Sequence, residues 1–175
     1  MSENNSVVIV AARRTPMGGM QGDFAGLAAP QLGAVSIKAA IEQAGIAPEA
    51  VDEVYFGNVV SAGLKQAPAR QAALGAGLPD SVPCTTISKV CGSGMKAAMI
   101  ARDQIVAGSA DVVLAGGMEN MSATPYLLPQ ARAGLRLGHG EVKDSLFTDG
   151  LEDAGSGALM GSFGQAIADP VSYTH

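Results

Sequence analysis

The sequence predicts an α/β protein with a mainly parallel sheet and helices on its faces. Short apolar runs without polar alternation recur between residues 7 and 116, which is typical of strands covered on both sides. Segments with apolar residues three and four positions apart separate these runs and indicate amphipathic helices. Strands that alternate with helices in this way form βαβ units, whose strands run parallel.

The first predicted strand covers residues 6–11. Because it is apolar and rich in Val and Ile, we expect a central parallel strand. A loop with Pro and Gly follows to residue 28. The next helix begins near Pro30, a residue suited to a first helical turn, and Gly45 can supply a left-handed cap at its end. Its apolar face consists of Ala34, Ile37, Ile41 and Ala44.

Three further apolar runs predict strands over residues 51–60, 84–88 and 111–116. Gly57 and Asn58 can kink the first of them. An Ala-rich helix is expected over residues 67–76, and a longer helix should run from near Cys91 to Gly108. The predicted apolar stripe of the longer helix consists of Met95, Ala98, Met99, the stem of Arg102, Ile105 and Val106.

After Met118 the periodicity weakens, and prolines and glycines interrupt every longer segment. A last helix is expected over residues 157–168, ending at Asp169-Pro170. It carries Leu159, Met160 and Phe163 on one side. We therefore expect an α/β domain over residues 1–120 and part of a loop domain over residues 121–175.

Composition excludes several classes of function. Eleven Lys and Arg against sixteen Asp and Glu give a net charge of −5, so the chain has no basic surface for nucleic acid or an anionic membrane. The two cysteines have no zinc-ligand spacing, and we expect no metal. No apolar run approaches the roughly 20 residues of a membrane-spanning helix. We therefore expect a cytoplasmic protein.

Cys91 is the candidate catalytic residue, because it falls where a predicted strand gives way to a helix. Helix N-termini stabilise the thiolate, which is the nucleophilic form of cysteine. Gly92 and Gly94 have no Cβ, so a thioester carbonyl could approach the sulfur and the main-chain amides, which could hold an oxyanion. The alternative is a buried structural cysteine, with glycines that only allow close packing. That structural interpretation is preferred for Cys84, which no Gly-rich turn accompanies.

The residues around Cys91 carry a resemblance to a known family. Residues 90–97 read VCGSGMKA and residues 107–122 read AGSADVVLAGGMENMS. Further matching segments are residues 10–18, 149–154 and 159–161. Together they resemble the thiolases, and most closely the N-terminal half of the bacterial acetyl-CoA C-acetyltransferases (acetoacetyl-CoA thiolases). The resemblance extends over nearly all of residues 7–169.

The resemblance implies an acyltransferase that condenses two acetyl-CoA molecules to acetoacetyl-CoA and CoA, or catalyses the reverse thiolysis. Cys91 matches the family's nucleophile, which forms an acyl-cysteine intermediate. Leu151 and Met160 match positions beside the pantetheine or acyl end of the substrate, in a loop domain that covers CoA; the alternative for both is ordinary core packing. The family needs no cofactor, since coenzyme A thioesters are its substrates, and its full-length members are homodimers or homotetramers.

Two family motifs are absent from the 175 residues: the Gly-His-Pro motif, whose histidine activates the nucleophile, and the Cys-x-Gly-Gly-Gly motif, whose cysteine is the second base. His139 lies in a loop, His175 is terminal, and neither replaces them. We therefore expect a truncated chain that is acylated slowly at Cys91 without forming carbon–carbon bonds. Two alternatives remain, a fragment that only associates with a partner and a related ketoacyl synthase.

Overall fold

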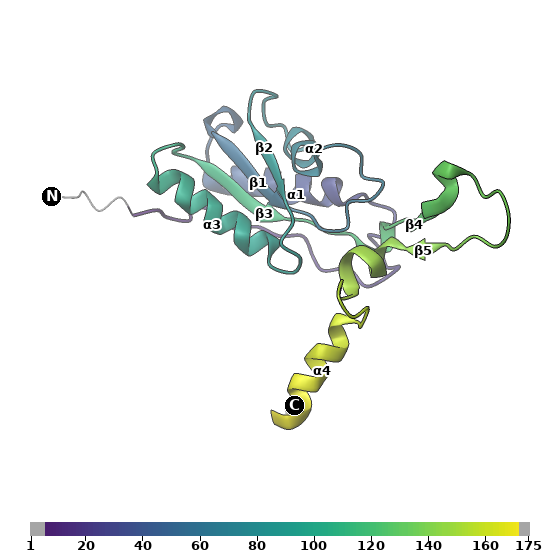
Figure 1. Ribbon diagram of the computed structural model, residues 1–175. Helices are drawn as coiled ribbons and strands as arrows, with labels where there is room; N and C mark the ends of the chain where they lie inside the picture. Colours follow the sequence, from purple (N-terminus) through teal and green to yellow (C-terminus); the bar gives the residue numbers. More distant parts are fainter. Residues whose placement is uncertain (1–5, 172–175) are drawn as a thin grey trace. The chain divides into compact units, whose positions relative to one another are not determined.

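The computed structural model describes residues 6–171, with side chains up to residue 168. The chain divides into two compact units, Met1–Ala123 and Thr124–His175. The first unit contains the predicted parallel sheet, and the second contains shorter elements (Figure 1). Within the described residues, no helix combines the length and apolarity that crossing a membrane requires.

The first unit is built on a three-stranded parallel sheet, which confirms the predicted fold class. The strands are β1 (Glu53–Gly57), β2 (Cys84–Ile87) and β3 (Val113–Gly117), in the order β2-β1-β3. Val54 of β1 is aligned with Cys84 on one side and with Leu114 on the other. Because the central strand β1 is covered on both faces, it is apolar and almost entirely buried.

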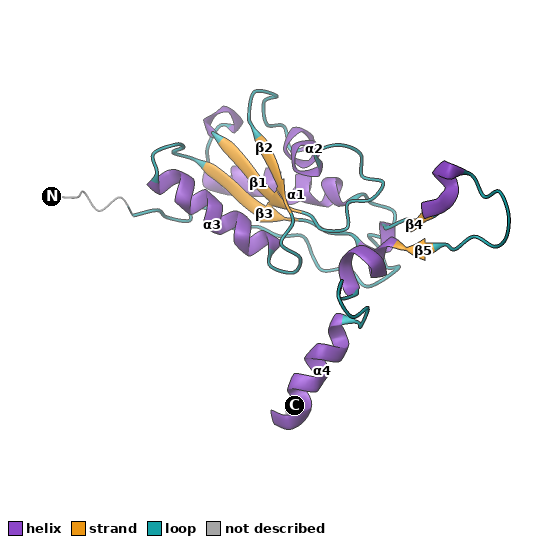
Figure 2. Ribbon diagram, in the orientation of Figure 1, coloured by secondary structure: helices purple, strands orange, loops and turns teal. Residues whose placement is uncertain are grey.

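Three helices cover this sheet: α1 (Ala29–Ala44), α2 (Pro68–Gly75) and α3 (Ser93–Val106). Figure 2 shows α3 in front of the strands and α1 behind them. In α1 the predicted signals are confirmed. Pro30 lies in the first turn, Ile37 and Ile41 are buried, and Gly45 ends the helix at a φ of 67°. The Gly45 N–H donates to the carbonyls of Ile41 and Glu42, which satisfies the end of the helix.

The apolar stripe predicted for α3 is wrong. Met95 is 74% exposed and Met99 is 50% exposed, whereas the buried face consists of Ser93, Ala97 and Ala101. These small residues recur every four positions and allow the helix to approach the glycine-lined ends of β1 and β3. The apolar periodicity predicted that the face with the larger side chains is buried. The face with the smaller side chains is buried instead, because it lets the helix backbone pack closely on the sheet.

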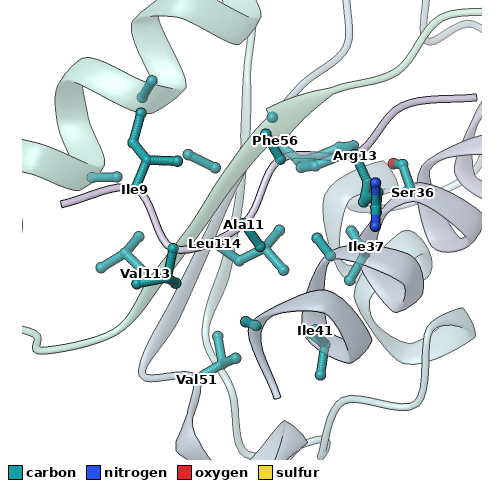
Figure 3. Close-up of a pocket in the computed structure, with 18 of the residues that line it drawn as sticks. Ile9, Ala11, Arg13, Ser36, Ile37, Ile41, Val51, Phe56, Val113 and Leu114 are labelled. Atoms are coloured by element: carbon teal, nitrogen blue, oxygen red, sulfur yellow. The ribbon is translucent and has the colours of Figure 1, made fainter. Parts of the chain in front are cut away.

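The strand predicted over residues 6–11 is also wrong, because this segment is extended but belongs to no strand. Residues 6–11 form no ladder with β3, and both segments contribute residues to the lining of a cavity of about 880 Å³. Figure 3 labels Ile9 and Ala11 among the residues that line this cavity, together with Val113 and Leu114 of β3. Ile9 is 90% exposed. The apolar composition of the segment is therefore not matched by burial.

The second unit contains a two-stranded antiparallel sheet of β4 (Tyr126–Leu127) and β5 (Lys143–Asp144). A 3-10 helix, η3 (Pro129–Ala133), a π-helical turn, η4 (Phe147–Leu151), and helix α4 (Met160–Val171) complete it. The predicted end of α4 at Asp169-Pro170 is slightly early. A proline removes only one helical hydrogen bond, and the backbone keeps its helical conformation for one more residue.

Candidate active site

Cys91 lies on the turn between the end of β2 at Ile87 and the start of α3 at Ser93. Its side chain is exposed and forms no disulfide. The preceding residue, Val90, has a φ of 46°, in the left-handed region that β-branched residues rarely adopt. The turn therefore presents the thiol to solvent on a backbone of unusual conformation. The buried-cysteine interpretation is excluded for Cys91.

A network of short hydrogen bonds holds this turn. The Lys89 N–H donates to the Ser93 Oγ at 2.8 Å, and the Ser93 hydroxyl donates to the Val90 carbonyl at 2.7 Å. Main-chain bonds run from Gly92 N to the Lys89 oxygen and from Ser93 N to the Val90 oxygen, at 3.0 and 3.1 Å. Ser93 was not among the predicted site residues. The signal in the sequence was a serine at the predicted start of a helix, and the structure shows that it is buried.

Glycines allow the start of α3 to pack directly on the carboxyl ends of the strands. A Cβ on Gly57 would lie 2.7 Å from the Ser93 Cβ and 3.0 Å from the Gly94 nitrogen. Gly94 itself lies against Gly116, with its virtual Cβ 3.8 Å from the Gly116 carbonyl. Gly94 thus lies in ordinary contact with the end of β3.

The start of α3 suits the stabilisation of negative charge. Its N-cap is Gly92, which has no side chain to bond the first-turn amides. Such amides point out of a helix end and carry partial positive charge, so they favour a thiolate or an oxyanion nearby. This arrangement can support nucleophilic attack by Cys91 on a carbonyl carbon.

A second polar cluster joins the ends of β1 and β3. The Glu119 carboxylate accepts hydrogen bonds from the Asn58 Nδ2 at 2.6 Å, the Val59 N–H at 2.8 Å and the Val60 N–H at 3.2 Å. Asn58 is 2% exposed, and its Oδ1 has no protein partner among the described residues. These contacts give Glu119 a structural role, because its carboxylate satisfies main-chain N–H groups after β1.

The Glu119 contacts predict a pH dependence of stability. Burial raises the pKa of Glu119 from its ordinary value of 4.5, and the N–H groups of Val59 and Val60 oppose this only in part. The folded chain therefore binds this proton more tightly than the unfolded chain. The corresponding stability is fully present below about pH 4.5 and is lost as the pH rises through the raised pKa.

Urea unfolding of the natural chain and of Glu119→Gln, measured from about pH 4 to about pH 7, checks this expectation. Glutamine does not titrate, so the loss of stability with rising pH should be smaller in the variant. At each pH, the free energy of unfolding of the variant is subtracted from that of the natural chain. The contributions of the other carboxylates, which both chains share, then cancel. Parallel pH profiles for the two chains would contradict the role assigned to Glu119.

Leu151 and Met160 are described in the second unit, whereas Cys91 belongs to the first. Leu151 ends η4 and is half-buried, and Met160 begins α4 and is 38% exposed. A β-bridge between Glu152 and Leu159 brings the segments that carry them together. A hydrogen bond from Asp153 N to the Ala158 oxygen, at 2.9 Å, supports this bridge. Leu151 and Met160 therefore lie on adjoining segments of one unit.

The remaining candidates are placed as predicted where they are described. Cys84 is half-buried on β2 and packs against the core, and burial raises the pKa of its thiol. His139 is exposed in a loop, and His175 lies outside the described residues. Between residues 6 and 171, no group of three His, Cys, Asp or Glu residues comes together as a set of metal ligands.

A strand-to-helix turn that exposes a cysteine, on a parallel α/β sheet, defines a candidate acyl-transfer site. The model of the thiolase N-terminal domain matches residues 7–174, so the chain belongs to the thiolase family. Among curated proteins, it is 52% identical over 166 residues to an acetyl-CoA acetyltransferase of Schizosaccharomyces pombe. It is also 53% identical over 168 residues to acetyl-CoA acetyltransferase 2 of Arabidopsis thaliana, and 51% identical over 168 residues to an acetyl-CoA acetyltransferase of Cupriavidus necator.

The alignments cover 95% of this chain with the S. pombe protein and 96% of it with each of the other two. They cover 42% of the S. pombe protein, 42% of the A. thaliana protein and 43% of the C. necator protein. The chain thus spans less than half the length of the relatives it matches. Because the family is now shown to be that of the thiolases, the ketoacyl synthase alternative is not carried further.

Proposed function

We propose that this chain supplies the acyl-accepting half of an acetyl-CoA acetyltransferase, with Cys91 as the nucleophile. The whole enzyme would condense two acetyl-CoA molecules to acetoacetyl-CoA and CoA, or catalyse the reverse thiolysis, in the cytoplasm. The observation that carries the proposal is the exposed Cys91 thiol at the uncapped start of α3. The relatives named acetyl-CoA acetyltransferase support the choice of substrate.

The first half-reaction transfers the acetyl group to Cys91. The thiolate attacks the thioester carbonyl carbon, and the resulting oxyanion is stabilised by main-chain amides at the start of α3. The carbon–sulfur bond to CoA then breaks, and the CoA thiolate takes up the proton that Cys91 lost. The products are an acetyl-cysteine and free CoA, and no cofactor takes part in the step.

The second half-reaction requires a base that removes a proton from the α-carbon of acetyl-CoA. In the resembling family this base and the activating histidine lie in motifs that residues 1–175 do not contain. We therefore propose that the chain alone accepts one acetyl group and stops. Leu151 and Met160 are proposed to contact the pantetheine or acyl end of the substrate in a CoA-covering unit, since both are apolar and only partly buried.

A second candidate function is association with another thiolase polypeptide. The outer side of α3 exposes Met95, Met99 and Val106, and the segment at residues 6–11 exposes Val8, Ile9 and Val10. Apolar area of this kind is typical of surfaces that another chain covers. This observation also favours a homo-oligomer for the full-length protein.

The release of CoA tests the proposed acyl transfer. When the chain is mixed with excess acetyl-CoA, free CoA thiol should appear up to one equivalent per chain and then stop, because nothing removes the acetyl group from Cys91. No acetoacetyl-CoA should accumulate. Steady formation of acetoacetyl-CoA by the chain alone would contradict the proposal that it stops after the first half-reaction. Complete absence of CoA release would contradict the proposed transfer of the acetyl group to Cys91.

A further inference from the structure

The Ser93 hydroxyl links two main-chain groups on either side of the turn that carries Cys91. It accepts from the Lys89 N–H at 2.8 Å and donates to the Val90 carbonyl at 2.7 Å. Ser93 is only 5% exposed, so water competes weakly for these bonds. We propose that Ser93 is a positioning residue, whose hydroxyl fixes the conformation of the turn and thereby the place of the Cys91 sulfur. This inference rests on the proposed role of Cys91.

The conformation of Val90 shows why the turn needs to be held. A β-branched residue at a φ of 46° is unfavourable and persists only where surrounding contacts impose it. The Val90 carbonyl accepts hydrogen bonds from both the hydroxyl and the N–H of Ser93. Ser93 therefore binds the peptide group that directly precedes Cys91, and the orientation of that peptide fixes the direction of the Cys91 side chain.

Packing fixes the Ser93 side chain in turn. A Cβ built on Gly57 would lie only 2.7 Å from the Ser93 Cβ. Ser93 therefore packs directly against the end of β1. A hydroxyl held in this way on rigid elements can orient a neighbouring loop residue. Without it, the Lys89 N–H and the Val90 carbonyl each lose a partner. Val90 can then rotate toward an ordinary negative φ, which moves Cys91 away from the first-turn amides.

The test uses the rate at which iodoacetamide alkylates each cysteine in the full chain, followed by peptide mass spectrometry. In Ser93→Ala we expect the rate at Cys91 to fall about tenfold, because the turn no longer holds the sulfur in its place before the start of α3. The rate at Cys84, which is half-buried on β2, should not change. Ser93→Thr keeps the hydroxyl and should restore most of the Cys91 rate.

A matched control is Ser36→Ala, which removes a hydroxyl that donates to the Gly33 carbonyl at 2.9 Å within α1. It should leave both cysteine rates unchanged. An unaltered Cys91 rate in Ser93→Ala would overturn the proposal. So would a rise at both Cys91 and Cys84, since that result means the hydroxyl only maintains the fold. Alkylation needs no CoA, so this result is independent of whether acetyl-CoA acylates the chain.

Discussion

Replacing Cys91 by serine is expected to abolish acetyl transfer from acetyl-CoA to this chain. A serine hydroxyl at this turn keeps its proton near neutral pH, and residues 1–175 contain no Gly-His-Pro histidine to remove it. The rate of CoA release should fall at least about 10³-fold, the scale on which loss of a nucleophile acts. Samples withdrawn over the slow course of the reaction and assayed for the free CoA thiol measure this rate.

Cys84→Ser is the matched control for this experiment, since it removes the other thiol of the chain. Cys84 is half-buried, and burial raises the pKa of its thiol, which disfavours the nucleophilic form. The Cys84→Ser chain should therefore release CoA at the natural rate. If Cys84→Ser lost the release of CoA while Cys91→Ser kept it, the nucleophile would be assigned to the wrong residue.

Gly57→Ala is expected to cause a large loss of stability. The new Cβ would lie 2.7 Å from the Ser93 Cβ and 3.0 Å from the main chain of Ser93 and Gly94. Backbone cannot move aside as a flexible side chain can, so the start of α3 must shift away from β1. Overpacking of this kind costs about 1–3 kcal/mol and occasionally more. The alkylation rate of Cys91 should change as well, because Cys91 precedes this helix end.

Gly117→Ala is the control, since Gly117 ends the neighbouring strand β3 in alignment with Gly57. Its virtual Cβ meets no atom closer than 3.5 Å, which is an ordinary contact. We expect a change in free energy of unfolding within about 0.5 kcal/mol. Urea unfolding of the two variants beside the natural chain measures the difference. Equal stability of Gly57→Ala and Gly117→Ala would contradict the packing described at the start of α3.

Most elements of the first unit could be predicted because their signals are local. Pro30 and Gly45 mark the ends of α1, and uninterrupted apolar runs mark β1 and β3. The strand expected at residues 6–11 is wrong because a strand also needs a partner, and this segment pairs with none of the described strands. Sequence periodicity carries no information on which neighbour a segment pairs with.

The candidate site could be predicted in part for the same reason. Cys91 was found because a strand end, a Gly-rich turn and a helix start follow one another within a few residues. The contacts of Glu119 with Asn58 and Val59 could not be found, because they join residues about sixty positions apart. The role of Ser93 depends on the left-handed φ of Val90. The residue types in the turn do not indicate this conformation, since β-branched residues rarely adopt it.

Cys91 is proposed to accept the acetyl group. Peptide mass spectrometry after incubation with acetyl-CoA locates the acetyl group, with Cys91→Ser as the control. We predict a gain of one acetyl group on the peptide that contains Cys91, reversed by added CoA thiol, and an unmodified Cys84 peptide. An acetyl group found only at another residue, or equal labelling of the natural chain and Cys91→Ser, would contradict the account.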